Sequence, residues 1–135
     1  MLRPEETAVI PASKIWLMLG SVGMLLAVVM GAFGAHGLKK TLAPDLMAIF
    51  ETAVHYHIYH ALGLLIVGML ALHLPATAYL RWSGILMTGG LLLFSGSLYA
   101  LSLSGHRWLG AITPLGGIAL VAAWLLLAVA VAKAD

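Results

Sequence analysis

Cysteine and charge are what this sequence lacks. The 135-residue chain has no cysteine, and only 9% of its residues are charged, against about 25% in a typical soluble protein. The missing cysteines exclude disulfides and thiolate metal ligands. The scarcity of charge excludes a soluble globular domain, and a net charge of +2 without a basic stripe predicts no nucleic-acid partner. Because 62% of the residues are hydrophobic, we predict an integral membrane protein surrounded by a lipid bilayer.

Four apolar windows are long enough to cross a membrane, for which a helix needs about 20 residues. They lie at about 15–35, 55–74, 79–103 and 114–132. Short loops join them, which predicts one all-α membrane domain over 1–135, an up-down four-helix bundle. The first window could be a signal peptide cleaved within "GAFGAHG". Its apolar run exceeds the usual signal length, so we interpret it as a span.

Two prolines mark helix starts. Pro44, followed by Asp45 in the first turn, predicts that the helix of the second span begins near residue 44, with an interfacial start near 44–54. In "AITPLGG", Thr113 is the predicted N-cap and Pro114 the first helical residue. The preceding "RWLGAI" is then a short interfacial segment, and the alternative is one helix kinked at Pro114.

Small residues and basic residues predict packing and orientation. Small side chains recur every four positions along the first span and predict close helix packing: Gly23, Ala27, Gly31 and Ala35. Basic residues are slightly more numerous on the side of the termini, which predicts cytoplasmic termini. The side of the termini carries Arg3, Lys14, Arg81 and Lys133, and the other side carries Lys39, Lys40 and Arg107.

Histidines gather at the side of the membrane opposite the termini. Five of the six lie there: His36, His55, His57, His60 and His106. Counting about 20 residues back from Leu74 reaches His55, so His60 is predicted to lie below the headgroups. A polar ring at that depth faces protein or water more readily than lipid.

Helical spacing sorts the residues of "FETAVHYHIYHALGLL" (50–65) into faces. Glu51, His55 and Tyr59 form one row, and Tyr56 and His60 a second row beside it. We predict that both rows face the bundle and that His57 falls just outside them. The remaining apolar sector is the predicted lipid-facing side: Phe50, Val54, Ile58 and Ala61.

Structural roles are the alternatives for these residues. Tyr56 and Tyr59 fit interfacial anchoring, and His36 could share a structural hydrogen bond with His60. Glu51 could pair with a basic residue: Lys39, Lys40 or Arg107.

Neither a metal site nor a catalytic site is predicted. His55, His57 and His60 do not share one helix face, so no single helix presents three ligands. The chain has no HExxH, no glycine-rich phosphate loop and no CxxC, and "GSLYALSLSG" lacks a nucleophile elbow. We therefore lean against an enzyme, although a lipid-acting one remains an alternative.

Four segments together resemble domain-of-unknown-function family 423, small bacterial membrane proteins related to transmembrane protein 256 of animals. They are "GAFGAHGL", "FETAVHYHIYHALGLL", "GSLYALSLSG" and "ITPLGGIALVAAW". The resemblance runs from about Gly31 to Trp124 and implies a four-span bundle in a bacterial inner membrane. It implies no activity or cofactor. His36, Glu51 and His60 match the family pattern, whereas His55 and His57 replace the more usual Arg and Gln.

Three functions follow as hypotheses. The first is a non-enzymatic accessory or assembly partner of a membrane complex, or a homo-oligomer. The second is binding of a lipid, quinone or haem between the first two helices through His36 and His60. The third is movement of protons or small solutes through Glu51, His55 and His60. The candidate polar cluster is His36, Glu51, His55, Tyr59, His60 and Thr113.

Overall fold

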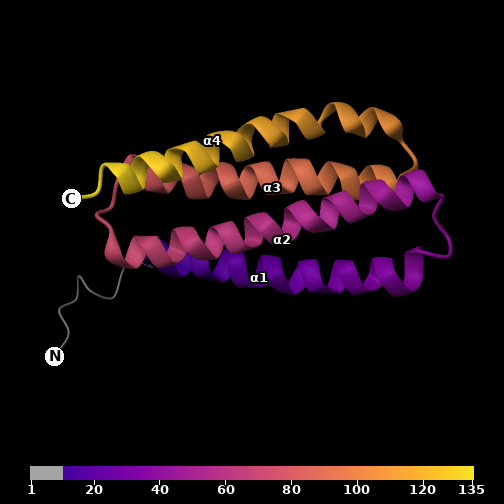
Figure 1. The fold of residues 1–135 in the computed structure, drawn as a ribbon, viewed down its shortest axis with the longest axis horizontal. Helices are drawn as coiled ribbons and strands as arrows, with labels where there is room; N and C mark the ends of the chain where they lie inside the picture. The colour runs from indigo at the N-terminus through magenta and orange to yellow at the C-terminus, as the bar shows by residue number, and fades with distance from the viewer. Residues whose placement is uncertain (1–10) are drawn as a thin grey trace.

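The computed structural model describes residues 11–135 and is all-α (Figure 1). Its four long helices run antiparallel in chain order: α1 (Ala12–Phe33), α2 (Pro44–His73), α3 (Ala78–Ser104) and α4 (Thr113–Ala132). A π-helical turn, η2 (Gly34–Leu38), extends α1, and a 3-10 turn, η3 (Arg107–Ala111), precedes α4. All four helices are long and apolar enough to cross a membrane. The predicted all-α fold with four spans is confirmed.

The helix boundaries follow local chemistry. Pro44 begins α2 as predicted, with Asp45 in the first turn. The predicted break before Pro114 is also confirmed, because η3 occupies it. The prediction that Thr113 is the N-cap is wrong, since Ile112 holds that position and Thr113 is already helical. The 3-10 turn runs directly into α4, and the Ile112 carbonyl accepts the Leu115 N–H at 3.1 Å.

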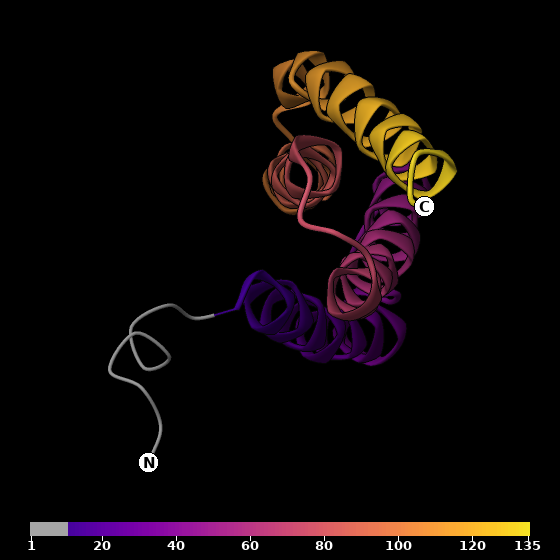
Figure 2. The same cartoon turned by 90° about the vertical axis from the view of Figure 1, so that its left-hand side faces the viewer.

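The helices form an open row rather than a closed bundle. Each helix packs against the next one in the chain, α1 on α2, α2 on α3 and α3 on α4. Within residues 11–135, α1 and α4 share no extensive contact, and α1 reaches α3 at only a few positions. Figure 2 shows α2 and α3 in the middle of the row and α1 and α4 at its outer ends. In such a row a hollow lies between helices that are not neighbours, α1 and α3 on one side and α2 and α4 on the other.

Small residues bring α1 and α2 together. A side-chain carbon added at Gly20 would lie 2.9 Å from the Leu65 backbone nitrogen, so no larger residue fits there. Gly23 faces Ala61 in the same way, and Ala27 is fully buried. Of the predicted stripe, Ala35 is exposed and lies outside this interface. The contact continues instead through Gly34, which packs on the Phe50 ring.

Hydrogen bonds tie α3 to both of its neighbours. Ser95 Oγ donates to the Ala53 carbonyl of α2 at 2.8 Å, and Ser83 Oγ donates to the Ala123 carbonyl of α4 at 2.8 Å. All four residues are buried. Apolar association gives no net driving force between helices in lipid, so packing and buried polar bonds of this kind fix the arrangement.

Candidate functional site

The buried face of α2 differs from the predicted one. Phe50 and Ala61 are fully buried and Val54 nearly so, although all three were assigned to the lipid-facing side. His57, placed outside the bundle, is buried with 9% of its surface exposed. The prediction of the facing is therefore wrong for most of this segment. The physical reason is that close contacts of α2 with α1 and α3 use its small and aliphatic residues.

The row of Glu51, His55 and Tyr59 points away from the neighbouring helices. All three residues are exposed, Tyr59 by 56%, and the His55 and Tyr59 rings stack at 6.4 Å. At the polar end of a span, Tyr and His side chains suit the headgroup region. Because His60 is buried on another side of the helix, the structure does not bring Glu51 and His55 together with it as a proton relay.

His60 does lie inside the protein, as its depth predicted. It is 6% exposed, and its Nδ1 lies 2.7 Å from the Tyr56 carbonyl oxygen of the preceding turn. The His60 ring lies 5.8 Å from the Tyr56 ring and 6.1 Å from the Trp124 ring, between centroids. His60 therefore faces α4.

His36 is not part of this cluster. It is exposed on the π-helical turn η2, and it is absent from the residues that line the hollow containing His60. Two facing histidines between α1 and α2, as haem ligation or a shared structural bond would require, are not formed. Thr113 is likewise engaged elsewhere, because its hydroxyl lies 2.7 Å from the Ser97 hydroxyl and links α4 to α3.

Two hollows flank the α2–α3 pair, as the open row requires. The α1/α3 groove has a volume of about 400 Å³, and α2 contributes His57 and Leu64 to its lining. His57 Nδ1 lies 3.0 Å from the Tyr99 hydroxyl there, so these two polar groups satisfy each other. The α2/α4 groove has a volume of about 640 Å³ and holds His60 and Trp124, with Phe94 of α3 between the two helices.

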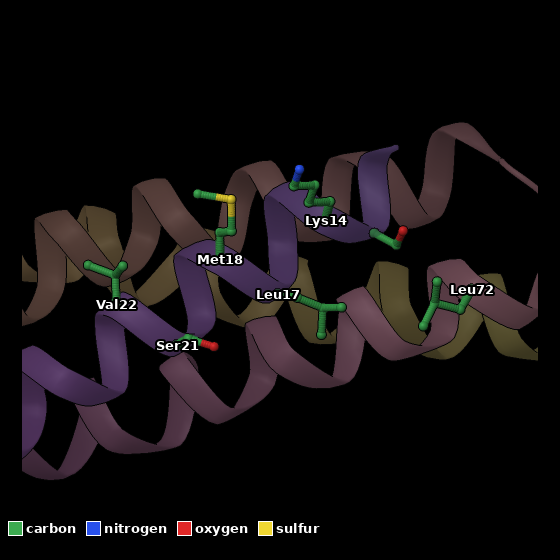
Figure 3. Close-up of a pocket in the computed structure, with 7 residues that line it drawn as sticks. Lys14, Leu17, Met18, Ser21, Val22 and Leu72 are labelled. Atoms are coloured by element: carbon green, nitrogen blue, oxygen red, sulfur yellow. The ribbon is translucent and has the colours of Figure 1, made fainter. Parts of the chain in front are cut away.

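A third hollow lies along α1 near the end of the bundle that carries the termini. Figure 3 shows Lys14, Leu17, Ser21 and Leu72 among its lining residues, from α1 and the end of α2. None of the predicted site residues lines it. Of the six residues of the candidate polar cluster, His60 alone lines one of these three hollows.

Charged and metal-binding groups are sparse in the part of the chain described. The salt bridge within residues 11–135 joins Asp45 to Arg107, both of them exposed. The alternative in which Glu51 pairs with Arg107 is not met, because Asp45 takes the guanidinium. No three His, Asp or Glu side chains of residues 11–135 lie close enough together to hold a metal ion.

Two features of the grooves are not predicted from the sequence. They are the His57–Tyr99 pair and the position of Trp124 in the α2/α4 groove. Helical spacing predicts that His57 lies just outside the rows that face the bundle. The hydrogen-bonding nitrogens of its ring are the one signal for a polar partner. Trp124 is not among the predicted site residues, and nothing in the sequence places it beside His60.

The comparisons with known proteins agree with this architecture. Residues 30–117 match the family model described as "Protein of unknown function (DUF423)". UPF0382 membrane protein YwdK of Bacillus subtilis (strain 168) is 47% identical over 120 residues, which are 89% of this chain and 98% of that protein. A UPF0382 membrane protein of Staphylococcus epidermidis (strain ATCC 12228 / FDA PCI 1200) is 43% identical over 89% of this chain and 97% of its own length. No solved structure matches. The chain thus belongs to the DUF423 family, and its relatives are named as UPF0382 membrane proteins.

Proposed function

We propose that this membrane protein is a non-enzymatic accessory subunit that packs against a transmembrane helix of a different membrane protein. The observation that carries the proposal is a pair of glycines on α3. Apart from the adjoining residues and nearby backbone of α3 itself, a side-chain carbon at Gly89 or at Gly96 would have no atom of residues 11–135 within 4 Å, and both residues are exposed. They are seven residues apart, two helical turns, and so lie on one face.

The other glycines inside the helices show what such residues do in this fold. At seven of them a side-chain carbon would come within 3.0 Å of another residue, so a side chain would collide: Gly20, Gly34, Gly63, Gly68, Gly84, Gly90 and Gly116. A helix-interior glycine costs roughly 0.5–1 kcal/mol relative to alanine. Gly89 and Gly96 bring this cost without a contact to another helix of the described residues, and a partner helix lying against α3 would supply the contact.

The surroundings of these glycines support a helix as the partner. Gly96 and Thr88 line the α1/α3 groove, whose walls are otherwise mainly aliphatic. Leu92 stands between the two glycines and is 70% exposed. Two small residues flanking a large one form a shallow ridge-and-hollow surface, which suits close packing of a second helix.

Co-purification after mild detergent extraction tests the proposal. The wild-type chain is expected to recover one membrane protein in fixed proportion, and reciprocal tagging of that protein is expected to recover this chain. Gly89→Leu and Gly96→Leu should each abolish recovery, because a leucine there holds the partner helix away. Ala128→Leu, at an exposed small residue of α4, is the matched control and should leave recovery unchanged.

Three outcomes would overturn the proposal. The first is a lone monomer at native abundance, and the second is a complex that contains only copies of this chain. The third is a partner whose recovery survives Gly89→Leu and Gly96→Leu.

Orientation and location belong to the same proposal. We infer that the chain lies in a bacterial inner membrane, with its termini in the cytoplasm. The end of the bundle with the termini carries Lys14, Arg81 and Lys133; Arg3 lies outside the described residues. At the opposite end Arg107 is paired with Asp45. Lys39 and Lys40 also lie at that end. Three basic residues near the termini therefore stand against two that make no salt bridge within residues 11–135, and this small excess supports the orientation.

A further inference from the structure

The α2/α4 groove is a second feature of the open row, on the other side of the α2–α3 pair. Its volume of about 640 Å³ lies within the range of small-molecule sites, about 300–1,000 Å³. Aromatic residues of three helices line it: Tyr56, Phe94 and Trp124. The Tyr56 and Phe94 rings stack at 4.3 Å between centroids. Aliphatic residues of α4 continue the lining, among them Ile118, Val121 and Leu125.

His60 supplies this groove with a hydrogen-bond acceptor. A backbone carbonyl only accepts, so the 2.7 Å contact with the Tyr56 carbonyl means that Nδ1 carries the proton and donates it. In the neutral ring Nε2 then bears a lone pair. Within residues 11–135, Nε2 has no hydrogen-bond partner. No fully buried side-chain nitrogen or oxygen of these residues lacks a partner, so Nε2 is open to the groove that His60, 6% exposed, lines. An unpaired acceptor in an apolar groove favours a ligand that donates a hydrogen bond.

We propose that the α2/α4 groove binds an amphipathic molecule with a flat, hydroxyl-bearing ring and an apolar tail, the chemistry of a membrane quinol. The ring lies among Tyr56, Phe94 and Trp124 by offset or edge-to-face packing. A ring hydroxyl donates to Nε2 of His60. The tail runs along the aliphatic residues of α4.

The α1/α3 groove is the weaker candidate for such a ligand. There the Tyr99 hydroxyl already lies at hydrogen-bond distance from His57 Nδ1, so the protein satisfies that contact itself. Of these two grooves within residues 11–135, the α2/α4 groove is the one that combines several aromatic rings with an unpaired acceptor. The proposal also sets a preference between redox forms: a quinol donates hydrogen bonds, whereas the oxidised quinone only accepts them.

Binding of a decyl-tailed benzoquinol to the full-length protein in phosphatidylcholine nanodiscs tests the proposal, with empty nanodiscs as the partition baseline. We expect saturable binding above that baseline. The quinone with the same tail, and the quinol with the His60→Leu variant, should each bind about fivefold more weakly, the factor that one ordinary hydrogen bond gives. His55→Leu, at an exposed histidine of the same helix, should bind the quinol as wild type does.

A second variant keeps the test decisive if His60→Leu fails to give a monodisperse protein. Ala122 lines the groove, and Ala122→Phe should fill it and abolish saturable binding while leaving His60 in place. The proposal is overturned if wild type binds no more than empty nanodiscs do. It is also overturned if the quinone binds as tightly as the quinol, or if neither groove variant weakens binding.

Discussion

The closest approach of α3 and α4 gives the most quantitative prediction. It concerns Gly116, in the first turn of α4. A side-chain carbon there would lie 2.4 Å from the Phe94 backbone nitrogen and 2.9 Å from the Gly90 carbonyl oxygen. The first distance is 1.0 Å shorter than 3.4 Å, the lower limit of ordinary van der Waals contact. Backbone atoms cannot rotate away, so Gly116→Ala must push the two helices apart.

The expected cost follows from this geometry. Overpacking costs typically about 1–3 kcal/mol, while replacing a helix-interior glycine by alanine returns about 0.5–1 kcal/mol. Gly117→Ala is the matched control, because its added carbon would meet only the Phe94 ring, at 3.7 Å. Both variants gain the same helix propensity. Gly116→Ala should therefore be less stable than Gly117→Ala by the overpacking cost alone, about 1–3 kcal/mol.

The assay is unfolding of the purified protein in detergent micelles by increasing sodium dodecyl sulfate, followed by circular dichroism. Gly116→Ala should unfold at a lower dodecyl sulfate fraction than wild type, and Gly117→Ala at the same or a higher one. Equal stability of the two variants would refute the contact between the α4 backbone and α3. Separation of α3 and α4 would also strain the Ser97–Thr113 bond.

Three further predictions concern single bonds and orientation. His57→Leu leaves the Tyr99 hydroxyl without its partner and should lower stability by about 0.6–1.7 kcal/mol in the same assay. His57→Gln should restore most of the loss. Equal stability of the two variants would show that the hydrogen bond contributes nothing. Thr113→Val removes the hydroxyl that lies beside the Ser97 hydroxyl, and it should be less stable than Thr113→Ser by about 0.6 kcal/mol. A valine variant as stable as the serine variant would contradict the link between α3 and α4. The proposed orientation has the termini in the cytoplasm, so a green fluorescent protein fused to the C-terminus should fluoresce and alkaline phosphatase fused there should be inactive. The reverse pair of results would invert the orientation.

The spans and the helix starts could be predicted because composition and local chemistry determine them. A bilayer requires long apolar helices, and the four windows in the sequence correspond to four helices in the structure. Pro44 marked the start of α2 because a proline suits the first helical position. The predicted N-cap at Thr113 is wrong because a 3-10 turn comes before it and puts the cap position at Ile112. This turn cannot be seen in the sequence.

The facing of α2 could not be predicted by the rule used for soluble proteins. In water the apolar side of a helix faces the core, but at the membrane interface an exposed Tyr, His or Glu reaches headgroups and water without cost to the fold. The row from Glu51 to Tyr59 is exposed for that reason, although it is polar. The small residues Ala53 and Ala61, both fully buried, were better guides to the interface.

The partners of the polar side chains depend on tertiary geometry. His60 was identified from its depth, but its neighbours come from α4 because the row is open between α2 and α4. Tyr99 lies 42 residues from His57 in the sequence, and nothing in the spacing along either helix brings the two together.

Photo-crosslinking in native membranes tests the accessory function most directly. A photoreactive amino acid at Leu92, between the two exposed glycines of α3, should form one discrete adduct with a different membrane protein, and Gly96→Leu should abolish it. The same amino acid at Ala128 of α4 should give none. Adducts to lipid alone at both positions, or an adduct that contains two copies of this chain, would contradict the account.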